Sequence, residues 1–73
     1  MTIYLNKNLI HLRKQKGWTQ HLTATLLGIP LKRYQAYEYE YATPPPIMLV
    51  KMAGLLEVDL TKLLVEPLYR QGG

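Results

Sequence analysis

The hydrophobic positions near the start of the chain follow the spacing of a helix that is apolar on one side. Leu5, Leu9 and Leu12 fall at i, i+4 and i+7, so they share one face. This pattern predicts a first helix over Asn6 to Lys16, with Asn6 as its N-cap. Gly17 follows as the expected C-terminal cap.

Caps and prolines predict four more helices in the rest of the chain. Thr19 is expected to cap the second helix, and Asp59 the fifth. Pro30 suits the start of the third helix and Pro46 that of the fourth, because the fixed φ of proline is compatible with a first helical turn. The expected spans are 20–27 ended by Gly28, about 31–39, a helix from about 46 that carries residues 49–56, and 60–64 stopped by Pro67.

A period-two pattern occurs once, at Tyr37, Tyr39 and Tyr41. It could indicate a strand, but the segment is isolated and polar between the tyrosines, so a helix end that runs into a loop is preferred. The fold class expected is therefore all-α, with five short helices.

The 73 residues are enough for one small domain, expected over 1–73 with a core at about 6–65 and a short frayed tail from Tyr69 to Gly73. No cysteine is present, so neither a disulfide nor a thiolate metal site stabilises the chain. No apolar run has the length of a membrane span, and the first twelve residues lack the order of a signal peptide. A cytoplasmic protein is expected.

Positive charge is concentrated in the first half of the chain. Residues 1–37 contain six lysines and arginines and no acid, whereas residues 38–73 contain three cations and five acids. Such a division is typical of a surface that binds a polyanion such as nucleic acid. A solvated basic surface without a partner is the alternative that charge alone leaves open.

Catalytic and metal-binding patterns are absent from the sequence. His11 and His21 are ten residues apart and have no cysteine or nearby acid to complete a metal site. No phosphate-binding loop, paired carboxylates or nucleophile with an adjacent base is found. We expect no enzyme activity, no metal and no cofactor.

The second and third predicted helices form a helix-turn-helix: a capped helix, a tight glycine turn and a further helix. An ordered set of residues around them resembles the XRE family, the Cro and phage-repressor type of regulator. The set comprises Leu12-Arg13-Lys14-Gln15-Lys16-Gly17, Thr19-Gln20, Ala24, Leu27-Gly28-Ile29, Glu38, Pro44, Leu49-Val50-Lys51-Met52-Ala53, Leu56 and 58–64. The resemblance covers about residues 6–65 and implies a lambda-repressor-like fold that binds duplex DNA.

The resemblance also implies residue roles. Thr19 and Gln20 correspond to backbone-contacting positions and are expected to touch phosphates. The recognition helix, about 31–39, is expected to enter the major groove and to contact base edges from the following positions: Leu31, Lys32, Arg33, Gln35 and Ala36. Lys32 or Arg33 suits guanine, Gln35 suits adenine, and the apolar members suit a thymine methyl.

Arg13 and Glu38 occupy positions that form an ion pair between the first and third helices in this family, and a structural role is expected. Tyr34 and Tyr37 occupy core positions, with their hydroxyls expected to reach the surface. Trp18 is expected to plug the core rather than to stack on bases.

Three departures from the family pattern stand out. Leu22 replaces a frequent Glu, so the capping box is missing, and it either forms an exposed pair with Leu26 or is buried by a rotation of the helix. The loop after the third helix, Tyr39 to Ala42, contains an acid where the family is often basic. Pro30 replaces a Ser or Thr cap.

The leading hypothesis is a small repressor-like regulator that binds double-stranded DNA as a homodimer in the cytoplasm, associated with the nucleoid. The segments 39–47 and 64–69 are candidate dimer surfaces. The alternative is a protein-interaction module of the same fold, antitoxin-like or adaptor-like, that binds a protein partner and has weakened DNA binding. The Leu22 and Leu26 pair favours the alternative, and the charge bias opposes it.

Overall fold

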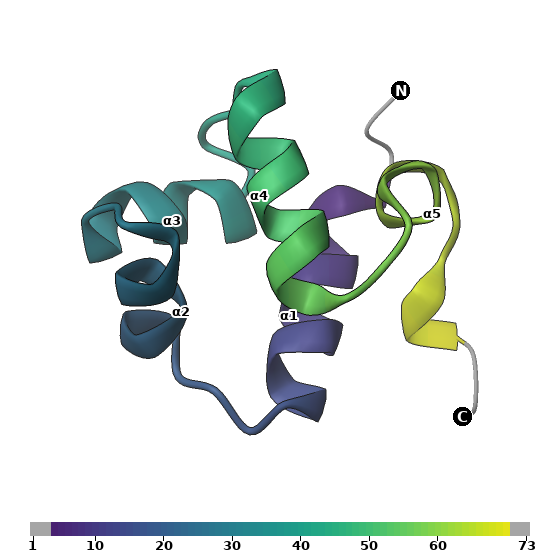
Figure 1. Cartoon of the computed structure of the whole chain (residues 1–73), viewed down its shortest axis with the longest axis horizontal. Helices are drawn as coiled ribbons and strands as arrows, with labels where there is room; N and C mark the ends of the chain where they lie inside the picture. The colour runs from purple at the N-terminus through teal and green to yellow at the C-terminus, as the bar shows by residue number, and fades with distance from the viewer. Residues whose placement is uncertain (1–3, 71–73) are drawn as a thin grey trace.

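The computed structural model describes residues 4–70, which form five α-helices and a final 3-10 turn (Figure 1). The elements are α1 (Leu5–Gln15), α2 (Gln20–Leu27), α3 (Leu31–Glu38), α4 (Pro46–Leu56), α5 (Leu60–Val65) and η1 (Leu68–Arg70). No strand occurs in this part of the chain, so the all-α prediction is confirmed. Tyr37, Tyr39 and Tyr41, which have the period-two spacing, lie in the end of α3 and the turn that follows it.

Side-chain caps begin α2 and α5 as the sequence predicted. Thr19 Oγ1 accepts a hydrogen bond from the Leu22 N–H at 3.0 Å, and Asp59 Oδ1 accepts one from the Lys62 N–H at 3.2 Å. The prediction that Asn6 caps the first helix is wrong. The helix α1 begins at Leu5, with Tyr4 as its N-cap residue, so Asn6 lies inside it. The N–H groups at the start of α1 have no side-chain cap.

The third helix begins where the sequence predicted and ends one residue earlier. Pro30 precedes Leu31 as the N-cap of α3, in extended conformation. Tyr39 lies just beyond the last residue of α3. The helix assigned to DNA recognition therefore has eight residues.

A left-handed residue follows each of the first four helices and reverses the chain. These residues are Gly17 (φ 73°), Gly28 (φ 75°), Glu40 (φ 63°) and Glu57 (φ 57°). At each site the N–H of the following residue donates to a carbonyl five residues earlier, as Trp18 does to Arg13 at 3.1 Å. These bonds satisfy carbonyl groups in the last turn of the helix. Glycine adopts this conformation without steric cost, whereas a glutamate pays about 1 kcal/mol.

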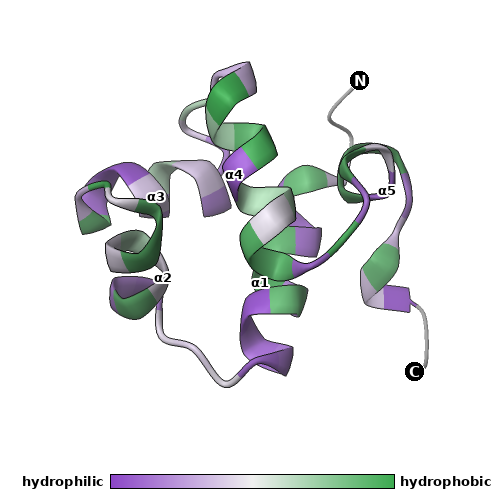
Figure 2. Ribbon diagram, viewed as in Figure 1, coloured by the Kyte–Doolittle hydropathy of each residue, from purple (hydrophilic) through white to green (hydrophobic). Residues whose placement is uncertain are grey.

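The helices pack around one apolar interior. In Figure 1, α2 and α3 lie together at one end, α1 and α4 occupy the middle of the view, and α5 with η1 lies against α1 at the other end. Figure 2 shows that α4 is largely hydrophobic, whereas the last turns of α1 are hydrophilic. The apolar side chains of the interior are Leu5, Leu9, Ala24, Leu27, Tyr34, Tyr37, Met48, Met52, Ala53, Leu56 and Leu63. No described helix is long and apolar enough to cross a membrane.

A buried asparagine of α1 holds the C-terminal elements in place. The Asn8 side chain is fully buried, and its Nδ2 donates to the carbonyls of Leu63 at 2.8 Å and Glu66 at 2.7 Å. Its Oδ1 accepts from the Leu68 N–H at 2.9 Å. The expected frayed tail is therefore wrong for residues 69–70, which belong to η1, while 71–73 lie outside the described residues.

Leucines on the outer side of α2 stay exposed. Leu22 and Leu26 are 41% and 48% exposed, and the helix is not rotated to bury Leu22. Thr23 is buried instead, with its hydroxyl donating to the Thr19 carbonyl at 2.9 Å. Of the two possibilities left open by the sequence, the exposed apolar pair is the one found.

Candidate nucleic-acid interface

An ion pair in the interior joins α1 to α3. Arg13 Nε lies 2.6 Å from Glu38 Oε2, and the two side chains are 10% and 1% exposed. Arg13 Nη1 also donates to the Trp18 carbonyl at 2.8 Å, which fixes the loop between α1 and α2. Burial alone lowers the pKa of Arg13, but the hydrogen bond and charge of Glu38 outweigh that effect and raise it.

The Glu38 carboxylate accepts four hydrogen bonds, two of them from Arg13. Besides Arg13, the Tyr34 hydroxyl donates to Oε2 and Gln20 Nε2 donates to Oε1 at 2.9 Å. Burial and the hydrogen bond to Glu38 raise the pKa of the Tyr34 hydroxyl far above its ordinary value, so this hydroxyl remains a donor. Tyr34 is wholly buried, so the expectation that its hydroxyl reaches the surface is wrong.

Gln20 carries this network from the interior to the surface. Its Nε2 donates to the Tyr39 hydroxyl at 3.1 Å as well as to Glu38, and its Oε1 accepts from Gln35 Nε2 at 3.0 Å. The first residue of α2 therefore fixes the side chain of Gln35 on α3. Tyr39 thus joins the candidate DNA surface, although the sequence pattern did not assign it to DNA contact.

The exposed side of α3 displays the remaining residues assigned to DNA contact. Lys32 and Arg33 are exposed, while Leu31, Gln35 and Ala36 are half-buried. Thr19, at the start of α2, is exposed as well. Because Tyr34, Tyr37 and Glu38 hold the opposite side of α3 in the interior, the helix presents one fixed face to solvent.

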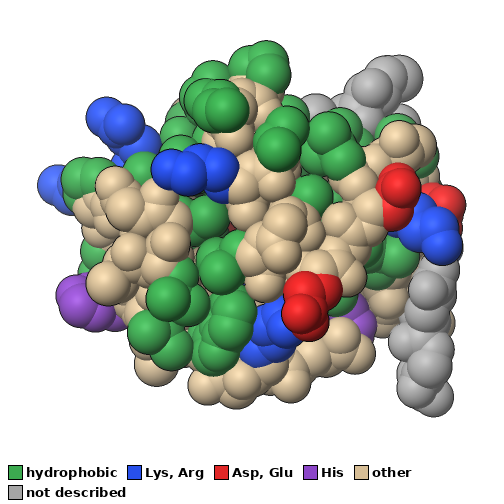
Figure 3. Space-filling model, in the orientation of Figure 1, with side chains coloured by type: hydrophobic (Ala, Val, Ile, Leu, Met, Phe, Trp, Pro, Cys, Tyr) green, Lys and Arg blue, Asp and Glu red, His purple; other side chains and the backbone are tan. Residues whose placement is uncertain are grey.

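The six cations of the first 37 residues do not form one surface. Arg13 is buried, Lys16 pairs with Glu57 at 3.2 Å over the Trp18 ring, and Lys7 lies near the Tyr69 ring. Figure 3 shows blue side chains at the α2–α3 end, and red ones only toward the α4–α5 side of this face. The basic charge near α3 is thus smaller than the sequence bias suggested.

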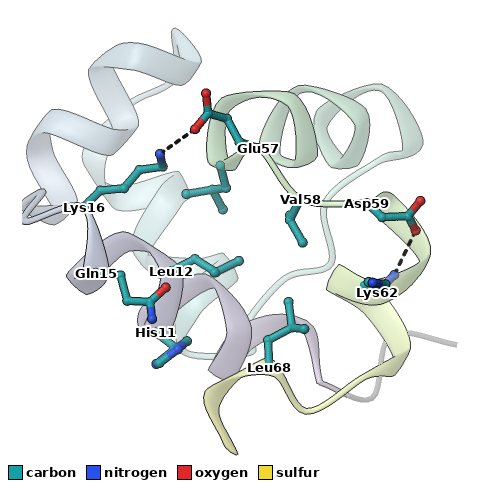
Figure 4. A pocket seen from close by; sticks show the side chains of 10 residues that line it. His11, Leu12, Gln15, Lys16, Glu57, Val58, Asp59, Lys62 and Leu68 are labelled. Carbon is teal, nitrogen blue, oxygen red and sulfur yellow. Dashed lines mark hydrogen bonds and ion pairs between the residues drawn. The ribbon is translucent and has the colours of Figure 1, made fainter. Parts of the chain in front are cut away.

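A further hollow lies away from α3, between α1 and the connection from α4 to α5. Figure 4 shows His11, Gln15 and Lys16 on one side of it and Glu57, Asp59 and Lys62 on the other. It encloses about 500 Å³. Lys16 is already bonded to Glu57, and Asp59 caps α5, so three of its charged side chains have partners within the protein. Among residues 4–70, no group of three or more His, Asp or Glu is placed to hold a metal ion.

Two smaller hollows flank the turn after α3. One, of about 320 Å³, has an almost wholly apolar lining made by the following residues: Lys32, Gln35, Ala36, Tyr39 and Tyr41. The other is lined by Leu5, Asn6 and Pro44 together with Glu40. The acid of this turn therefore borders a different hollow from its tyrosines.

Comparison with known proteins agrees with this architecture. A helix-turn-helix family model matches residues 9–63, which is most of the chain. The HTH-type transcriptional regulator AnsR of Bacillus subtilis (strain 168) is 39% identical over 56 residues, covering 77% of this chain and 48% of the relative. The chain thus spans about half the length of the curated relative that it matches. No solved structure matches it significantly.

Proposed function

The chain belongs to the XRE type of the helix-turn-helix family, and from this premise we propose that it is a small, repressor-like transcriptional regulator. It binds a specific duplex sequence with α3 in the major groove, which is about 12 Å wide and admits one helix. Its role is binding rather than catalysis. A regulator that binds genomic DNA would be located in the cytoplasm, at the nucleoid.

The observation that carries this proposal is the fixed outer face of α3. Lys32 and Arg33 are exposed donors on it, and Gln35 is held by Gln20. Lysine and arginine suit guanine, and an oriented amide suits adenine. Leu31 and Ala36 supply apolar contacts beside them. The N–H groups in the first turn of α2, next to Thr19, suit a phosphate because that turn leaves them without intrahelical partners.

A dimer on DNA is part of the proposal. Of the two candidate dimer surfaces, the observations favour the one that runs into α4, where Ile47 is 69% exposed and its neighbour Val50 is 55% exposed. The segment 64–69 is less suitable, because Leu68 is buried and Asn8 already bonds its backbone. Two such subunits would contact half-sites about 34 Å apart.

Selection from a random duplex library, followed by fluorescence anisotropy across salt concentrations, tests the proposal. We expect an enriched inverted repeat and a steep salt dependence, with each neutralised phosphate adding about −0.9 to the log–log slope. The variant with Lys32→Ala, Arg33→Ala and Gln35→Ala should lose the preference for that sequence. The variant with Lys51→Ala and Lys62→Ala removes the same charge from elsewhere and should keep the preference.

A protein-interaction module remains the second candidate, because Leu22 and Leu26 expose an apolar pair on α2. Exposed apolar patches mark sites of contact with other proteins. A folded protein that enriches no duplex and shows a flat salt slope would favour this candidate and contradict DNA binding.

A further inference from the structure

We propose that the hollow over Ala36, walled by Tyr39 and Tyr41, is a socket for the C5-methyl group of a thymine. This inference rests on the proposed function, since it assumes that α3 enters the major groove. It adds Tyr39 and Tyr41 to the residues that determine which sequence is bound.

The socket is built on one stripe of α3. Lys32, Gln35, Ala36 and Tyr39 fall at i, i+3, i+4 and i+7, so they lie along the outward side of the helix. The small Ala36 leaves a depression between the longer side chains. Tyr41, beyond the helix, closes one end, and its ring meets that of Tyr39 edge to face with 6.2 Å between centroids.

The lining selects an apolar group. Its surface is almost wholly apolar, so a base edge that presents only donors or acceptors would lose hydrogen bonds with water and could regain them only from Lys32 and Gln35 on the rim. Among the four bases, thymine alone presents a methyl group in the major groove. The volume of about 320 Å³ is ample for that methyl and the adjoining edge of the ring.

The position of Tyr39 is fixed before any ligand arrives. Its hydroxyl accepts from Gln20 Nε2 at 3.1 Å, and Gln20 is bonded in turn to the buried Glu38. The wall therefore needs little ordering when DNA binds, which preserves the gain from burying a methyl group.

Charge favours a polyanion beside the socket. Lys32 forms part of its rim, and Arg33 is exposed next to it. Glu40 borders the separate hollow near Leu5 and Asn6, and the charge of Glu38 is balanced by Arg13. The loop from Tyr39 to Ala42, which carries an acid where the family is often basic, thus presents its tyrosines to the outer side of α3, while its acid borders the other hollow.

Deoxyuridine scanning tests the socket. Each thymine of the selected site is replaced singly by deoxyuridine, which removes the methyl group and changes no hydrogen-bonding group. At one position in each half-site we expect the affinity of the parent protein to fall about three- to tenfold. For the Tyr41→Ala variant, the thymine and deoxyuridine sites should bind equally at that position. Because Tyr41 is 83% exposed, this variant should fold like the parent.

Tyr41→Phe is the matched control, since it keeps the ring and should keep the preference for thymine. If every deoxyuridine site binds as tightly as the parent site, or if Tyr41→Ala keeps the full preference, the socket is wrong while sequence-specific binding stands. If no site is enriched at all, the proposed function fails and the socket with it.

Discussion

Two buried polar residues of α1 tie the two ends of the molecule to its centre in different ways. Asn8 is neutral and bonds three backbone groups of the α5–η1 end. Arg13, five residues later, is charged and bonds a carboxylate and a carbonyl at the α2–α3 end. The first set of bonds ends inside the protein, whereas the second continues through Gln20 to the outer side of α3.

The difference separates stability from recognition. A change at Asn8 loosens the C-terminal elements and leaves the face of α3 as it was. A change at Arg13 disturbs Glu38, which positions Gln20, so it affects both the fold and the candidate DNA surface. The following predictions test this contrast.

Arg13→Ala should have the largest effect. It leaves the Glu38 carboxylate buried without its cation, at a cost of about 3–5 kcal/mol in the free energy of unfolding. A chain of 73 residues has only about 4–11 kcal/mol in total, so the variant should be largely unfolded at moderate temperature. Thermal and urea denaturation measure this loss.

The neighbouring exposed cation provides the control for that experiment. Lys14→Ala should change the unfolding free energy by less than about 0.5 kcal/mol. An Arg13→Ala protein that melts like its parent and has merely lost DNA affinity would show that the ion pair serves binding rather than folding.

Asn8→Ala should cost about 2–4 kcal/mol, because three buried backbone groups lose their partner at once. Urea denaturation gives this number, and the folded fraction should bind DNA with unchanged sequence preference. Asn6→Ala is the matched variant on the same helix, and it should be nearly neutral because Asn6 is half-exposed. An altered sequence preference in Asn8→Ala would mean that the two ends are coupled after all.

Alkaline pH should distinguish the two ends as well. The pKa of Tyr34 is raised in the folded protein, so its stabilisation is complete below the unfolded value of about 10 and is lost above it. Above pH 10 this group should lower the unfolding free energy by about 1.4 kcal/mol per pH unit. Tyr34→Phe should have a shallower decline, whereas Asn8→Ala should keep the parent slope. Equal slopes in all three proteins would contradict the assignment.

Glu40→Gly should have the smallest effect and the opposite sign. Removing the left-handed penalty should stabilise the fold by about 0.5–1 kcal/mol in thermal denaturation. Glu57→Gly should gain less, because it also removes the exposed ion pair with Lys16. Glu40→Ala is the control, since alanine has the same steric cost as glutamate in the left-handed conformation. A glycine variant no more stable than the alanine variant would show that this conformation costs nothing here.

Much of the fold could be predicted because its signals are local. Thr19 and Asp59 cap helices through groups three residues away, and Gly28 ends α2 through its own φ. Such features depend on a few neighbouring residues and are visible in any sequence. Glu40 and Glu57 end helices without that signal, since glutamate is not expected at positive φ.

The unpredicted features depend on residues that are distant along the chain. Asn8 lies beside the apolar stripe of α1, and its partners are 55 to 60 residues away, so no local pattern identifies it. The charge bias of residues 1–37 was visible, and the family resemblance implied the pair of Arg13 with Glu38. The pairing of Lys16 with Glu57, 41 residues away, could not be inferred from composition. Tyr39 joined the candidate DNA surface only through its contact with Gln20.

The bonds that end at Gln35 also have a direction, and that direction determines what Gln35 offers to a base. An ionised carboxylate can only accept, so Glu38 requires Gln20 to turn its Nε2 inward and its Oε1 outward. Gln35 must then give an N–H to that oxygen, which turns its own carbonyl away from Gln20. On the proposed function, the negative charge in the interior would thereby leave Gln35 an acceptor at the surface, suited to a base amino group such as that of adenine or cytosine. The buried carboxylate of Glu38 would thus help to determine which base is preferred at one position of the binding site, without itself contacting DNA.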